Sequence, residues 1–181
     1  MPSQFPILRH CNKPISRLTS FEDNFMNLKE TVKLRLFTLF KIPLIHFCRP
    51  QVLTLNENEC RVRIPFRRRV RNHIGSMYFG AIAAGADLAG GLIALYLIGK
   101  SGHKIQFVFK EVRGEFLRRV HGPADFYCGD GAAIQEAIRQ TIQSGERVHI
   151  PVTVSVTGPA QPDDGELARF ELTLSVKMKT D

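Results

Sequence analysis

The segment from Met77 to Ile98 constrains the fold more than any other part of this 181-residue chain. It is 22 residues long and carries one charge, Asp87. A segment of this length could span a bilayer. However, a carboxylate near its middle is costly in lipid, and the glycines at 80, 85, 90 and 91 weaken a helix. The sequence therefore predicts a long helix buried in a protein core.

The rest of the chain predicts a sheet around that helix. Apolar spacing favours an amphipathic helix from Leu28 to Ile42, stopped by Pro43. Alternating or β-branched runs predict strands at Gln51–Leu55, Glu59–Phe66, Lys104–Lys110, Glu115–Cys128, Val148–Val156 and Leu167–Met178, with a short helix at Gly131–Ser144. The strands come in hairpin-like pairs, so we expect an α+β fold in which one antiparallel sheet wraps the apolar helix. One domain is predicted for residues 28–181, preceded by an N-terminal extension at 1–27.

Charge and cysteine content narrow the classes of partner. The chain has 25 Lys and Arg against 17 Asp and Glu, a net charge of +8, which favours an anionic partner. The basic run Arg67–Arg71, with Arg61 and Arg63, could touch phosphates, but no aromatic residues interleave with it as single-strand binding requires. A solvated surface and no nucleic acid are therefore expected. The four cysteines lie far apart and form no metal-ligand pattern, which indicates reduced thiols in a cytoplasmic protein without a metal site.

Asp87 is the main candidate for chemistry. On a helical projection, Ser76, Gly80, Ala83, Gly91 and Ala94 lie on its side, leaving space for a slender ligand. A carboxylate kept from water acquires a raised pKa and makes a useful base. The alternative is a buried carboxylate satisfied by an N–H group or a cation.

The approach to the predicted helix is the second clue. The polar turn from Arg71 to Ser76 leads into the helix, whose first free N–H groups can bind an oxyanion. Asn72 could donate a hydrogen bond to the same oxygen. For Ser76, ordinary capping of the helix is the alternative.

These residues resemble a known family. The run Asn72-x-x-Gly75-x-x-Tyr78-Phe79-Gly80, continued by Asp87-Leu88-Ala89-Gly90, is similar to the helix motif of hotdog-fold acyl-CoA thioesterases of the phenylacetate-pathway type, NxxGxxHGGxxxxxxDxAxG. The Gly-Ser-Met-Tyr-Phe-Gly start is most similar to the DUF4442 branch. The resemblance implies a hotdog fold, a homodimer or dimer of dimers, and sites at the subunit interface.

The resemblance also implies roles for individual residues. Asp87 would act as base or nucleophile on a thioester, and Asn72 would position water or substrate. Oxyanion and substrate positioning would fall to Ser76, Tyr78, Phe79 and Gly80, with the N–H group of Phe79 or Gly80 polarising the carbonyl. The cations expected to hold coenzyme A phosphates are Lys100, Arg118 and Arg119.

The sequence is compatible with two classes of function. The first is hydrolysis of an acyl thioester, carried on coenzyme A or on an acyl-carrier protein, with no cofactor apart from the coenzyme A of the substrate and no membrane span. The second is a non-catalytic acyl-binding protein, favoured because Tyr78-Phe79 replaces the His-Gly pair of the motif. A hotdog dehydratase is disfavoured because its catalytic His has no counterpart here.

Overall fold

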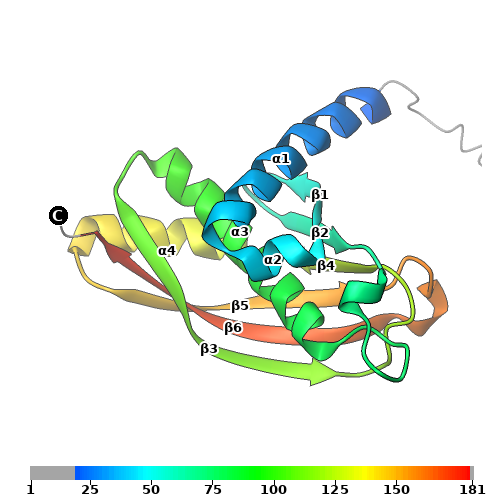
Figure 1. Ribbon diagram of the computed structural model, residues 1–181. Coiled ribbons are helices and arrows are strands. Elements are labelled where there is room, and N and C mark those ends of the chain that lie inside the picture. The colour runs from blue at the N-terminus through cyan, green and yellow to red at the C-terminus, as the bar shows by residue number, and fades with distance from the viewer. Residues whose placement is uncertain (1–18, 180–181) are drawn as a thin grey trace, which may run out of the picture.

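The apolar segment forms helix α3 (Phe79–Ser101), which lies against a curved six-stranded sheet (Figure 1). The structure is a computed structural model that describes the backbone of residues 19–179 and the side chains of residues 28–179. All neighbouring strands pair antiparallel. Their order is β1 (Gln51–Leu55), β2 (Cys60–Ile64), β4 (Ala124–Cys128), β5 (Val148–Thr157), β6 (Glu166–Met178) and β3 (Ile105–Phe116). This is the predicted α+β arrangement.

Small residues let α3 lie close to the sheet. A β-carbon added at Gly85 would overlap the ring of Phe126, which is fully buried, and one added at Gly90 would come within 3.1 Å of Leu172. In the described part of the chain, α3 is the one helix long and apolar enough to cross a membrane. Its most apolar 18-residue window is nevertheless 61% buried inside the protein. Core packing therefore accounts for its composition, as predicted.

The strand boundaries around residue 110 differ from the prediction. Strands were expected at Lys104–Lys110 and Glu115–Cys128, whereas β3 continues without a break to Phe116 and β4 is limited to Ala124–Cys128. The register of β3 against β6 shifts between Phe109 and Glu111, so one extra residue interrupts the alternation there. A bulge of this kind makes one long strand look like two in the sequence.

The N-terminal region contains more helix than predicted. Helix α1 (Thr19–Lys41) begins nine residues before the expected start, so residues 19–27 of the predicted extension are helical, while residues 1–18 lie outside the described part. Pro43 ends α1 as predicted, but it also opens a short second helix, α2 (Pro43–Cys48). Proline is well suited to a first helical turn because its missing N–H group has no partner there. Six residues are too few to show a helical period in the sequence.

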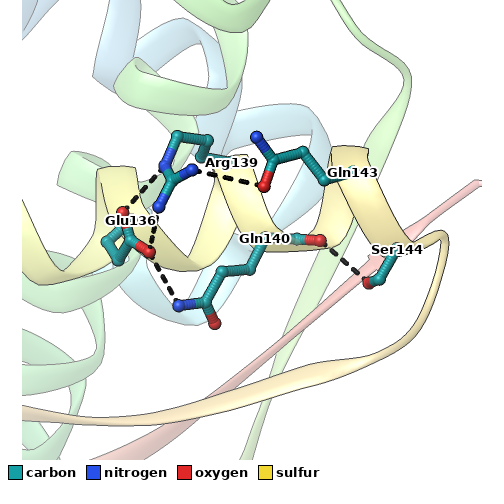
Figure 2. A network of polar contacts seen from close by, with 5 residues as sticks. All are labelled: Glu136, Arg139, Gln140, Gln143 and Ser144. Atoms are coloured by element: carbon teal, nitrogen blue, oxygen red, sulfur yellow. Dashed lines mark hydrogen bonds and ion pairs between the residues drawn. The ribbon is translucent and has the colours of Figure 1, made fainter.

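Helix α4 (Gly131–Ser144) has the predicted bounds and a divided surface. Its apolar residues face the core, whereas the exposed face carries a network centred on Glu136 and Arg139 (Figure 2). The guanidinium of Arg139 donates to Glu136 at 2.6 and 2.9 Å and to Gln143 at 3.2 Å. Contacts three and four residues apart of this kind each stabilise a helix by roughly 0.2–0.5 kcal/mol. The network is therefore a structural feature of the helix surface.

Two buried cysteines lie opposite each other on neighbouring strands. Cys60 of β2 pairs in register with Cys128 of β4, both are fully buried, and neither forms a disulfide. Burial raises the pKa of both thiols, that of Cys128 to about 11.

We expect these two thiols to resist alkylation in the folded protein. At pH 8 a thiol with a pKa near 11 is ionised to only about one part in 10³, and the thiolate is the reactive form. Mass mapping of peptides after iodoacetamide treatment should show labelling of Cys60 and Cys128 only when denaturant is present. Rapid labelling of Cys128 without denaturant would contradict the packing described here.

Candidate active site

The turn before α3 is held together by Asn72 and Ser76. The Oδ1 atom of Asn72 accepts hydrogen bonds from the N–H groups of Ile74 and Ser76, each at 3.1 Å, and its Nδ2 atom donates to Ser76 Oγ at 2.8 Å. Gly75 adopts a φ of +80°, a conformation that side chains disfavour, so the turn needs a glycine there. Asn72 and Ser76 thus shape the turn, and a direct role on substrate stays a prediction.

The helix begins without a side-chain cap. Tyr78 is the N-cap residue, so the capping role considered for Ser76 is wrong. The N–H groups of Phe79 and Gly80 donate no hydrogen bond within the described residues. Unsatisfied donors at a helix start carry partial positive charge and suit an anionic oxygen. The predicted oxyanion donors are therefore available at this end of α3.

Aromatic rings surround these donors. The ring of Tyr78 lies over Gly80, where an added β-carbon would be 2.5 Å from Tyr78 Cε1. The Tyr78 and Phe79 rings are 4.7 Å apart between centroids, and both side chains are substantially exposed. Since an exposed ring can rotate away, Tyr78 restricts access to the helix start without blocking it permanently.

A pocket of about 400 Å³ opens at the helix start. It is lined by Asn72, His73, Ser76, Met77, Tyr78, Phe79, Ile82, Phe116, Arg118, Arg119 and Val120. Two of the predicted cations, Arg118 and Arg119, therefore lie beside the candidate oxyanion donors. Among the described residues, the Arg118 side chain pairs with Asp164 at 3.4 Å on the surface, a long contact that leaves it able to meet another anion.

Asp87 lies in a different pocket, farther along α3. This pocket has a volume of about 390 Å³ and is almost entirely apolar. It is lined by Leu34, Phe37, Thr38, Ile42, Ile45, Asp87, Leu88, Gly91, Leu92, Leu95, Phe107, Val108 and Phe109. Asp87 is open to solvent on one side in the single chain, yet the desolvation caused by its surroundings raises the pKa of its carboxyl group. A carboxylate with a raised pKa is the chemistry expected of a general base.

The two parts of the candidate site are too far apart to act together within one chain. Eight residues of helix separate Phe79 from Asp87, which is about 12 Å at 1.5 Å per residue. A base must come within roughly 3 Å of the proton that it takes, and an oxyanion donor must be equally close to the carbonyl oxygen. A small reacting group therefore cannot meet both from the same chain.

The third predicted cation lies elsewhere. Lys100 is near the C-terminal end of α3, where its Nζ atom pairs with Glu57 Oε1 at 2.5 Å and lies 5.2 Å from the centre of the Tyr96 ring. Thirteen residues of helix, about 20 Å, separate Lys100 from Asp87. The structure does not bring Lys100 together with Arg118 and Arg119 in one chain.

Sequence reasoning missed one wall of the Asp87 pocket. Leu34, Phe37 and Ile42 come from α1 and the α1–α2 junction, and Phe107 and Phe109 come from β3. The predicted small face is only partly open, because Gly91 lines the pocket whereas Ala94 is fully buried in the core. No local pattern in the sequence shows that residues of α1 and α3 line the same pocket, since this arrangement is tertiary.

Comparisons with known proteins agree with this architecture. The family described as Domain of unknown function (DUF4442) matches residues 31–176. A Pseudomonas aeruginosa protein named a probable thioesterase superposes with a TM-score of 0.67 at 22% identity, over 82% of this chain and 96% of that one. A Chlorobaculum tepidum protein of unknown function superposes with a TM-score of 0.70 at 14% identity, over 84% of this chain and 97% of that one. A Haemophilus influenzae thioesterase superposes with a TM-score of 0.60 at 13% identity, over 81% of this chain and 90% of that one. No curated protein sequence matches the chain.

The sheet wrapped around α3 is a hotdog fold, as the resemblance in the helix motif implied. Within that class of fold, the chain belongs to the DUF4442 family.

Proposed function

We propose that this protein hydrolyses acyl thioesters. The observation that carries the proposal is Asp87, an acidic side chain with a raised pKa on the wall of an apolar pocket. Unpaired N–H groups at the start of α3 supply the second element that thioester hydrolysis needs. The likeness in fold to proteins named thioesterases in two other organisms supports the same reaction class.

In the proposed reaction, the Asp87 carboxylate takes a proton from a water molecule as the water oxygen bonds to the thioester carbonyl carbon. The negative charge that develops on the carbonyl oxygen is stabilised by the N–H groups of Phe79 and Gly80. The tetrahedral intermediate then breaks its C–S bond, and the leaving thiolate receives the proton held by Asp87. The products are a carboxylic acid and a free thiol. Direct attack by Asp87 on the carbonyl carbon, followed by hydrolysis of the anhydride, uses the same groups.

The proposed site is completed by a second copy of the chain. In one chain Asp87 lies about 12 Å along the helix axis from Phe79. We therefore infer that each site combines Asp87 of one protomer with the α3 start of the other. A two-fold dimer forms two such sites by symmetry. Strand β3, at one edge of the sheet, exposes Val108, Val112 and Phe116, which is apolar surface that a partner can cover. This supports a homodimer as the working unit.

The two pockets suggest where the parts of a substrate would bind. An acyl group fits the apolar pocket beside Asp87, whose volume of about 390 Å³ is within the range of ligand pockets. The phosphates of coenzyme A, or the acidic surface of a carrier protein, would meet Arg118 and Arg119 at the other pocket. The net charge of +8 favours either carrier.

A thiol-release screen over short, aryl and long-chain acyl-CoA substrates tests this function. Release of free thiol from at least one substrate is the expected result. The second candidate, a non-catalytic acyl-binding protein, is favoured by the Tyr78 ring that lies over Gly80 at the helix start. Saturable acyl-CoA binding without any thiol release would support that candidate and contradict hydrolysis.

We predict that Gly80→Val weakens substrate binding more than it weakens the fold. The three heavy atoms nearest to an added β-carbon all belong to the Tyr78 ring, which is exposed and can move, so the melting temperature should change little. The same side chain would occupy the space through which a carbonyl approaches the helix start. Melting temperature and acyl-CoA affinity should be measured on the same variant. Retained affinity together with a lowered melting temperature would identify Gly80 as a packing residue and refute this site.

A further inference from the structure

Most of the large apolar side chains of α1 point away from the protein core. Its inner face carries Thr31, Leu34 and Thr38, all buried. Its outer face carries large apolar side chains that remain exposed: Leu28, Val32, Leu36, Leu39 and Phe40, the last with 77% of its surface accessible. A helix that packs on a core normally turns its apolar stripe inward. Within residues 28–179, the apolar side of α1 is therefore not covered by the core.

Hydrogen bonds account for the two threonines on the inner face of α1. β1 is an edge strand, so its outward N–H groups lack a strand partner. Thr31 Oγ1 accepts a hydrogen bond from the Val52 N–H group at 2.9 Å. Thr38 Oγ1 is satisfied within the helix, at 2.9 Å from the Leu34 carbonyl oxygen. The bond between Val52 and Thr31 links β1 to α1 and holds the helix with its apolar side outward.

Helix α2 continues the same kind of surface. Leu44 is 70% exposed, and Phe47 is also exposed. We call the exposed set Leu28, Val32, Leu36, Leu39, Phe40, Leu44 and Phe47 the α1–α2 apolar face. Figure 1 shows α1 projecting from the body of the fold, whereas α2 lies beside α3. A group of exposed apolar side chains of this kind is typical of an interaction site.

Cations border the α1–α2 apolar face. The guanidinium of Arg69 lies 5.4 Å from the centre of the Phe47 ring, which brings the basic run of the sequence next to α2. Arg67 and Arg68 are exposed beside it. Glu30 is the only acidic residue between Leu28 and Arg49, and it is paired with Lys33 at 2.8 Å.

Other arginines of the basic region are already engaged. Arg63 makes a two-pronged ion pair with the buried Asp125, and Arg71 lies 4.4 Å from the centre of the Phe66 ring. The part of the run that remains open to a partner is therefore the part beside α2.

We propose that the α1–α2 apolar face docks on an anionic membrane surface. Exposed aliphatic and aromatic side chains on a helix, bordered by Lys and Arg, are the features by which amphipathic helices lie in the lipid interface. A second copy of the chain fits less well, because a two-fold contact through this face would bring the same cations against each other. The proposal concerns surface attachment and does not depend on the proposed hydrolysis.

Flotation of the full chain with lipid vesicles tests the proposal. Vesicles of phosphatidylglycerol and phosphatidylcholine in equal parts should carry the protein upward in a density gradient, and the bound fraction should fall as salt is added. Vesicles of phosphatidylcholine alone should bind it more weakly. Absence of the protein from both floated fractions would overturn the proposal.

Matched variants assign the binding to this face. Phe40→Ser combined with Leu44→Ser should reduce vesicle affinity by at least about tenfold. Replacing Arg67 and Arg68 with glutamine should cost about fivefold per cation removed on anionic vesicles, and little on neutral ones. Leu117→Ser, at an exposed apolar residue away from both helices, should bind as the unmodified chain does. Equal binding by the Phe40/Leu44 variant would overturn the proposal.

Two further outcomes would assign the face to another partner. The unmodified chain could fail to bind vesicles and instead form an assembly that, by light scattering, is larger than that of the Phe40/Leu44 variant. This result would identify the face as a contact between copies of the chain. Capture by an acidic acyl-carrier protein in place of vesicles would make it a protein-docking surface. Since neither Phe40 nor Leu44 lines the Asp87 pocket, hydrolysis of a short acyl-CoA in vesicle-free buffer should persist in this variant and tests the proposed function separately.

Discussion

Asp87→Asn is expected to remove thioester hydrolysis and, at neutral pH, to make the protein more stable. Loss of a positioned general base typically lowers the rate by about 10²–10⁴-fold. The amide has nearly the shape of the carboxylate, so the pocket around it should be unchanged. Thiol release under single-turnover conditions, with circular dichroism as a check of the fold, measures both effects. Undiminished turnover in the variant would contradict the assigned role.

The gain in stability follows from the direction of the pKa shift. Desolvation raises the pKa of Asp87 in the folded protein above its unfolded value, so the folded state holds its proton more tightly. The folded protein therefore has its full stability below the unfolded pKa of Asp87, where the carboxyl group is protonated. It loses stability as pH rises through the folded pKa, because the desolvated carboxyl group becomes charged. Asparagine carries no charge, so the variant does not lose stability in this way. Its melting temperature should exceed that of the unmodified chain at neutral pH, and the difference should shrink below the usual carboxyl range.

Gly85→Ala is expected to give a large loss of stability without any direct effect on the site. The added β-carbon would overlap Phe126, whose ring is fully buried between α3 and the sheet. Forcing one extra carbon into a packed core costs about 1–3 kcal/mol, which lowers the melting temperature of a domain of this size by several degrees.

Gly99→Ala is the matched control on the same helix. No atom lies within 4 Å of a β-carbon added there, and alanine favours a helix over glycine by roughly 0.5–1 kcal/mol. The control should therefore melt at the same temperature as the unmodified chain or higher. Equal melting temperatures for the Gly85 variant and the unmodified chain would mean that α3 does not lie as close to β4 as described.

The sequence predicted those elements whose periodicity is uninterrupted. Helix α4 has the predicted bounds, and β5 and β6 differ from the prediction by one residue at a single end each. The alternation of β3 is broken by the bulge after Phe109, so its length was not predictable from pattern alone. The start of α1 was missed because the predicted apolar period began at Leu28.

The candidate site was predictable only in part. Asp87 could be singled out because an isolated charge in an apolar segment is energetically costly unless it has a function. The apolar wall that α1 contributes, including Leu34 and Phe37, depends on where the chain places α1 in the fold and leaves no local signal. The grouping of Lys100 with Arg118 and Arg119 did not allow for the length of α3, which places Lys100 at the far end from the other two.

In the proposed dimer, each site combines Asp87 of one protomer with the α3 start of the other. Asp87→Asn and Gly80→Val chains, each with strongly reduced turnover alone at substrate concentrations below saturation, can be unfolded together and refolded in equal amounts, with light scattering to verify dimers. A mixed dimer then has one site with both defects and one site with neither. Half of the dimers formed at random are mixed and each has one intact site, so we expect recovery of about a quarter of the unmodified activity. If the mixture remains as inactive as the two separate variants although mixed dimers have formed, both groups act within one chain, which contradicts this arrangement.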